Sequence, residues 1–227
     1  MGALFDQESP HPVAVHFPGE HTHYFERLRD ATPYFSRAEI VPQPGAGVAT
    51  YALGGGLTLT IAPLDHGMPC QGYRIDEPDG VRMLPEKLRA AGIAGPDVGR
   101  LQADGRLGDV TLAEVSETRP GQSFAFLMDT RLCPNTLRLA DGVDLLVAES
   151  TFLAAETELA EAFGHLTAGQ AAAIAKEAGA RELVLTHFSQ RYPPEEAERF
   201  RDEAAAVFDG PVHVAEDLMR IPFPKRG

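Results

Sequence analysis

Four side chains that could bind a metal ion or move a proton follow apolar stretches of the sequence. Asp129, Glu149 and His187 lie at the ends of "SFAFLMD", "DLLVAES" and "ELVLTH", and His66 follows "LTLTIAPL". Imidazole and carboxylate groups together form a ligand set that suits zinc. One such residue is weak evidence, but several at strand ends in one chain favour a metal site.

Each candidate also has a structural interpretation. Asp129 could form a turn in which its carboxylate pairs with Arg131. A lone histidine at a strand end, such as His66 or His187, is more often structural than a ligand. His165, in "GHLTAGQ", could be a solvent-facing residue ahead of a helix. These alternatives stay open on the residues alone.

The elements that must position these residues are clearest in the second half of the chain. Apolar, β-branched runs predict strands, and capping residues ahead of amphipathic runs predict helices. The predicted strands are 57–64, 123–129, 144–150, 182–187 and 212–217. The predicted helices are 84–92, 167–179 and 193–208, and 41–56 predicts turns between short strands. Alternating strands and helices indicate an α/β sheet, whose ligands bind beyond the carboxyl ends of its strands.

Composition narrows the class of protein. The chain has 227 residues, of which 44% are apolar and 23% charged, as in soluble globular proteins. No run of about 18 apolar residues and no signal peptide is visible. Two distant cysteines, Cys70 and Cys133, favour free thiols and a cytoplasmic location. The net charge of −13 argues against indiscriminate binding of nucleic acid, although it leaves room for a local basic surface.

The segments around these residues resemble, in order, the later motifs of the ribonuclease Z family. They are "LDHGMPCQGYRI", "FLMDTRLC", "ADGVDLLVAESTF" and "GHLTAGQAAAIAKEAGARELVLTHFSQRY", and "PVAVHFPGEHTHYFERL" resembles an earlier family segment. The resemblance implies a metallo-β-lactamase-like αββα sandwich, formed as a single domain over residues 1–227. It places an arm-like insertion at about 76–119. The implied activity is that of a zinc-dependent endoribonuclease, a phosphodiester hydrolase that removes the 3′ trailer from precursor tRNA.

The resemblance also assigns roles. His66, Asp129 and His187 correspond to ligands of two zinc ions, with Asp129 bridging them, and His165 to the group that protonates the leaving oxygen. Ser189, Arg191 and Tyr192 match a signature that is implied to bind substrate. In the arm-like stretch, tRNA is expected to meet Arg82, Lys87, Arg89, Arg100 and Arg106, although these could also be solvated surface charges. A cytoplasmic homodimer is implied.

One departure from the family pattern concerns its principal metal motif, His-x-His-x-Asp-His, which does not occur in these 227 residues. The one His-x-His, His21 and His23, lacks the following Asp-His and is expected at the surface. We therefore expect a fold that is incomplete at the N-terminus, through truncation or degeneration, and a zinc site too poor in ligands for tight binding. Two alternatives remain: another phosphodiesterase or hydrolase of the same fold, or a non-catalytic relative that binds tRNA or dimerises.

Overall fold

The computed structural model describes residues 11–31 and 38–226, and these form two compact units. The core unit contains the described residues up to Asp76 together with Ser123–Lys225. The inserted unit contains Glu77–Gln122 and Arg226. All candidate metal-binding residues lie in the core unit, and each unit is described by itself.

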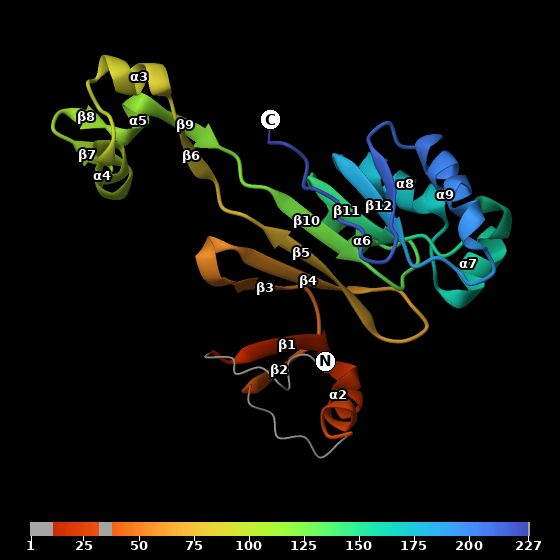
Figure 1. Ribbon diagram of the computed structural model, residues 1–227. Helices are drawn as coiled ribbons and strands as arrows, with labels where there is room; N and C mark the ends of the chain where they lie inside the picture. Colours follow the sequence, from red (N-terminus) through yellow and green to blue (C-terminus); the bar gives the residue numbers. More distant parts are fainter. Residues whose placement is uncertain (1–10, 32–37, 227) are drawn as a thin grey trace. The chain divides into compact units, whose positions relative to one another are not determined.

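A seven-stranded mixed sheet forms the centre of the core unit (Figure 1). Its order is β13-β12-β11-β10-β5-β4-β3, with β10 to β13 parallel and the other pairs antiparallel. The strands are β3 (Ala49–Ala52), β4 (Thr58–Leu64), β5 (Cys70–Asp76), β10 (Ser123–Leu127), β11 (Leu145–Glu149), β12 (Glu182–Thr186) and β13 (Val212–Val214). The nearly continuous apolar runs of β11 and β12 suit parallel strands that are covered on both faces.

Three helices contact this sheet and build the main hydrophobic core with it: α6 (Pro134–Ala140), α8 (Ala168–Glu177) and α9 (Ala197–Ala205). In α8, buried alanines such as Ala171 and Ala175 let the helix approach β11 and β12. Its capping box is confirmed, since Thr167 and Gln170 exchange backbone-to-side-chain hydrogen bonds of 2.8 and 3.2 Å. At ten residues α8 is the longest described helix; a bilayer span needs about 20, so no described helix could cross a membrane.

A two-stranded parallel sheet precedes the main sheet in the chain. It consists of β1 (Val13–Pro18) and β2 (Ile40–Gly45). The segment between these two strands contains η1 (Gly19–His21) and α2 (Thr22–Arg29). Phe17 stacks on Phe25 with ring centroids 4.5 Å apart, which holds α2 against β1. The Gly- and Pro-rich stretch 41–56 thus contains most of β2 and all of β3, with turns between them.

The inserted unit has a small core of its own. Its strand pair β6 (Gly80–Met83) and β9 (Ser116–Arg119) leads into and out of a cluster of short elements. These are α3 (Pro85–Ala90), α4 (Pro96–Asp104), β7 (Arg106–Leu107), β8 (Val110–Thr111) and α5 (Leu112–Val115). Leu88, Ile93, Leu101 and Val115 are buried together, so this stretch is more ordered than its scattered Gly and Asp residues suggest.

Candidate metal centre

The carboxyl ends of three adjacent parallel strands bring the candidate residues together. Asp129 follows β10, and His187 follows β12, on the other side of β11. One ligand atom from each of Asp129, His165 and His187 lies within 4.8 Å of the others. His187 Nε2 is 2.8 Å from Asp129 Oδ1, and His165 Nδ1 is 4.0 Å from the same oxygen. Asp129 therefore faces two imidazoles, and the alternative that it pairs with Arg131 is wrong.

Both strand-terminal ligand candidates have unusual backbone conformations. Asp129 has φ 50° and His187 has φ 62°, so both lie in the left-handed region. Such residues each cost on the order of 1–3 kcal/mol and concentrate at functional sites. At these two positions the strain aims the side chains at one point beyond the sheet edge.

The thiol of Cys70, at the start of β5, supports this turn. Its Sγ donates a hydrogen bond of 3.0 Å to the backbone oxygen of Asp129. Burial raises the pKa of Cys70 to about 11, with smaller contributions from the charges of Asp129 and Cys133. The thiol is therefore protonated at neutral pH and remains a donor to the strained residue.

Glu149, at the end of β11, is fully buried and holds His165 in place. His165 Nδ1 is 2.9 Å from Glu149 Oε1. Further hydrogen bonds to the carboxylate come from the backbone N of Thr130, Thr151 and Leu166 and from the Thr151 hydroxyl. His165 is only 16% exposed, so its interpretation as a solvent-facing residue is wrong. The sequence placed Glu149 at a strand end among the residues that could bind metal or move a proton, but it did not predict the contact with His165; an acid closing an apolar run was the available signal.

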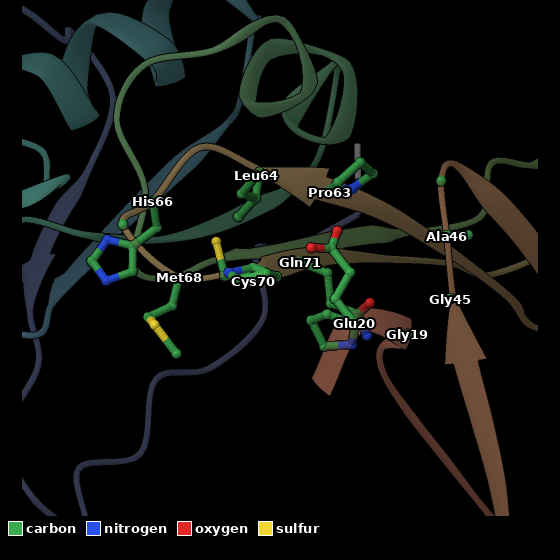
Figure 2. A pocket seen from close by; sticks show the side chains of 14 residues that line it. Gly19, Glu20, Gly45, Ala46, Pro63, Leu64, His66, Met68, Cys70 and Gln71 are labelled. Carbon is green, nitrogen blue, oxygen red and sulfur yellow. The ribbon is translucent and has the colours of Figure 1, made fainter. Parts of the chain in front are cut away.

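His66 lies on the loop between β4 and β5, beside a pocket (Figure 2). Its Nδ1 is 2.9 Å from the backbone oxygen of Gly164, and its ring centroid is 5.0 Å from that of His165. The figure shows Met68, Cys70, Gln71 and Glu20 along the same pocket. Within the described residues, His66 borders the three-residue cluster without belonging to it.

Gly164 lies against His66 and has no side chain that would displace it. It has φ +82°, and a Cβ built on it would lie 2.7 Å from His66 Nδ1. We expect Gly164→Ala to displace His66, to lower the free energy of unfolding by about 1–3 kcal/mol and to weaken zinc binding. Urea unfolding and zinc titration would measure both effects. The matched control is Gly142→Ala, which has φ +61° but an unobstructed Cβ position, and should lose stability without losing zinc affinity.

The signature that follows His187 divides between packing and solvent. The Tyr192 hydroxyl accepts a hydrogen bond from Leu153 N at 3.1 Å, and its ring packs edge-on against Phe200. Ser189 Oγ accepts one from the Arg191 backbone N at 3.3 Å. The Arg191 side chain is exposed and has no ion-pair partner within the described residues.

Cations of the inserted unit are only partly available. Arg82 pairs with Glu117 and Arg100 with Asp97. Lys87 and Arg89 are exposed on α3, either side of buried Leu88, and neither has an ion-pair partner in the described ranges. Residues 77–122 contain six basic and eight acidic residues, so any attraction for phosphate must be local.

The histidines of the single His-x-His lie away from the sheet edge. His21 ends η1, and His23 is exposed in the first turn of α2. Both rings contact Tyr24, with centroids 5.2 and 3.9 Å away. Neither belongs to the cluster of possible metal ligands found in the described part of the chain.

Comparisons with known proteins agree with this arrangement. A model of the beta-lactamase superfamily domain matches residues 96–188. The chain is 52% identical to the ribonuclease Z of Streptomyces avermitilis over 217 residues, which cover 96% of this chain and 72% of that protein. The chain belongs to the ribonuclease Z family. The ribonuclease Z of Thermobifida fusca is 53% identical over 222 residues, covering 95% of this chain and 70% of its relative.

Solved structures confirm the α/β metallo-β-lactamase fold that the sequence implied. The short form of human tRNase Z superposes with a TM-score of 0.61 at 20% identity, covering 99% of this chain and 73% of that one. The metallo-beta-lactamase fold protein YhfI from Bacillus subtilis gives a TM-score of 0.60, also at 20% identity, with 91% and 64% coverage. At such identities the likeness concerns the fold, while family membership rests on the ribonuclease Z sequences.

Proposed function

We propose that this chain, as a ribonuclease Z, is a metal-dependent phosphodiester hydrolase that removes the 3′ trailer from precursor tRNA. The observation that carries the proposal is the cluster of Asp129, His165 and His187, backed by buried Glu149 at the carboxyl edge of the sheet. Family membership supplies the substrate class, and the cluster supplies the chemistry.

The donor set of the site fits zinc. Carboxylate oxygen and imidazole nitrogen are both zinc ligands, and Asp129 and His187 present them 2.8 Å apart. We propose that zinc, when bound, would be held by Asp129 and His187, and that His66 would help to hold a second ion. Bound zinc lowers the pKa of a coordinated water and polarises a phosphoryl oxygen. Nδ1 of His66 is hydrogen-bonded to the backbone oxygen of Gly164, so Nε2 is the ring nitrogen that remains to bind a metal ion.

The part of His165 is to move a proton. Both oxygens of Glu149 are surrounded by donors, so the carboxylate acts as an acceptor and the proton between the two residues belongs to Nδ1 of His165. This fixes the ring and directs its Nε2 away from Glu149. In the imidazolium form of His165, Nε2 carries a second proton; we propose that this proton passes to the leaving 3′ oxygen, which leaves a neutral ring with its remaining proton on Nδ1.

Binding of the tRNA backbone is proposed for the inserted unit, through Lys87 and Arg89. Phosphate contacts dominate affinity for nucleic acid and make it depend on salt. We expect the double variant Lys87→Ala/Arg89→Ala to weaken precursor-tRNA binding and to reduce the slope of log affinity against log salt by about two, one for each contact. Fluorescence anisotropy over a series of KCl concentrations measures this slope.

The matched control is Arg82→Ala/Arg100→Ala, which removes two cations that already pair with acids of the same unit. Its slope should change less. Cleavage of bis(p-nitrophenyl) phosphate, a substrate too small to need tRNA contacts, should be unchanged in both double variants. An equal loss on both substrates would mean that α3 supports the fold instead of binding RNA.

Family resemblance further supports a homodimer in the cytoplasm, where bacterial precursor tRNA is made. Analytical ultracentrifugation over a range of concentrations tests the dimer. A sedimentation coefficient that stays at the monomer value would contradict it.

Incubation of the chain with a precursor tRNA, with added zinc or with a chelator, tests the proposed function. Zinc-dependent release of an intact 3′ trailer would support the proposed function. A specific observation favours an alternative, because the 227 residues lack His-x-His-x-Asp-His and the described site offers few ligands. Binding of tRNA without cleavage would indicate the non-catalytic relative. Hydrolysis of a small diester without cleavage of tRNA would indicate another phosphodiesterase.

A further inference from the structure

Arg131 links two loops and one helix near the candidate metal centre. Its backbone N donates to Asp65 O at 2.7 Å, and its Nη1 lies 3.2 Å from Asp65 Oδ1. Its Nε donates to the backbone oxygen of Glu161 at 2.9 Å, near the end of α7 (Thr157–Phe163). One side chain thus joins the β4–β5 loop, the β10–α6 loop and α7.

Each linked position is close in sequence to a candidate site residue. Asp65 immediately precedes His66, and Arg131 follows Asp129 by two residues. Glu161 lies four residues before His165. A shift at any of these three links would move an imidazole or the carboxylate of the centre.

Thr130 tightens the same junction from inside. It is fully buried, and its Oγ1 accepts a hydrogen bond from Asp65 N at 3.2 Å and donates one of 2.7 Å to Arg131 O. Its backbone N donates to Glu149 Oε1 at 2.7 Å. The consecutive residues Thr130 and Arg131 therefore connect the β4–β5 loop, at Asp65, to the buried carboxylate of Glu149.

We propose that Arg131 is a positioning residue, which holds His66, Asp129 and His165 at the separations that metal binding requires. The inference rests on the proposed metal site and extends it to a residue outside the ligand set. Arginine suits the task because its planar guanidinium donates in two fixed directions at once. The ε-ammonium of lysine is a single point charge and cannot reproduce both bonds.

The exposure of the acidic partners of Arg131 indicates how much the residue adds to the stability of the fold. The side chain of Arg131 is 25% exposed, and those of its two acidic partners are more so, Asp65 at 55% and Glu161 at 71%. The Glu161 carboxylate lies 3.7 Å from Nε, so the hydrogen bond to Glu161 is made by its main chain. Exposed ion pairs add little to the free energy of unfolding. The removal of Arg131 should therefore change the affinity for metal much more than the stability of the fold.

The test compares Arg131→Gln and Arg131→Lys with the control Arg181→Gln. Arg181 also joins an acid to a main-chain oxygen, Asp144 and Lys225 O, but beside the opposite ends of β11 and β12. Zinc affinity is measured by competition with a chromophoric chelator, and the melting temperature by circular dichroism. We expect both Arg131 variants to bind zinc about tenfold more weakly, as is typical when an outer-shell support is lost. Arg181→Gln should bind zinc as tightly as the parent chain does. Its melting temperature should shift about as much as those of the Arg131 variants.

Amide hydrogen exchange without metal provides a second readout that needs no cleavage of RNA. Exchange should accelerate at 65–69 and 160–165 in the Arg131 variants and stay unchanged there in the control. Asp65→Asn, which keeps the backbone bond, should give a smaller effect in the same direction.

Parent-like zinc affinity and exchange in Arg131→Lys would overturn the proposal, because charge alone would then suffice. A raised KM for a small diester with unchanged zinc affinity would also overturn it, since Arg131 would then bind phosphate. If the parent chain cuts no RNA but its variants show these losses, the proposed function fails and the positioning role stands.

Discussion

Replacement of Asp129 with Asn should lower the zinc affinity of the chain by more than about 100-fold, because even outer-shell partners change metal affinity about 10–100-fold. The amide keeps the shape of the side chain but removes the charge that faces His187 Nε2 at 2.8 Å and His165 Nδ1 at 4.0 Å. Asn also tolerates the left-handed backbone at this position, where φ is 50°. Isothermal titration with zinc, and metal analysis after dialysis, measure the loss.

The free energy of unfolding of the metal-free chain should change by no more than about 1 kcal/mol in this variant, since the contact between Asp129 and His187 is half-exposed. Asp209→Asn is the control, because Asp209 is 94% exposed and its ion-pair partner among the described residues is Lys176, at 3.8 Å. Unchanged zinc binding in Asp129→Asn would show that Asp129 is not a ligand. His21 and His23 would then be the first donors to examine.

Glu149→Gln should be costly for both stability and catalysis. Oε1 of Glu149 accepts from Thr130 N and His165 Nδ1, and Oε2 from Leu166 N and Thr151. An amide NH₂ in place of either oxygen would point a donor at other donors inside the protein. We expect the free energy of unfolding to fall by about 3 kcal/mol, as for buried polar groups left without partners. Urea unfolding followed by circular dichroism measures it.

Catalysis should fall about 10²–10⁴-fold in Glu149→Gln, the usual contribution of general acid–base groups, because His165 loses the acceptor that orients it. Single-turnover cleavage of precursor tRNA, below the temperature at which the variant unfolds, separates this effect from lost stability. Glu182→Gln is the matched control, since Glu182 also pairs with a histidine, His213, at 3.0 Å but at the opposite end of β12. A cleavage rate equal to that of the control would contradict the orienting role of Glu149.

Local sequence was sufficient for those features that depend on neighbours in the chain. Apolar runs predicted the strands that became β10, β11 and β12, and parallel strands end at one edge, so Asp129 and His187 were expected to meet there. The capping box at Thr167 involves residues three apart. Ordered motifs also indicated the ribonuclease Z family before any fold was known. Short elements escaped, because the seven residues of α6 or α7 make at most two turns and show little periodicity.

The tertiary structure alone decided which polar groups meet. Sequence adjacency suggested Arg131 as the partner of Asp129, but its guanidinium reaches Asp65, 66 positions away. His66 contacts Gly164 across 98 positions, and His165 was found behind the sheet edge, not in solvent. Contacts of this kind have no local signal, because they depend on how loops from different strands close over one edge. The sequence therefore determined the family and the residues that reach this edge, whereas packing decided that Glu149 and Arg131 would hold them there.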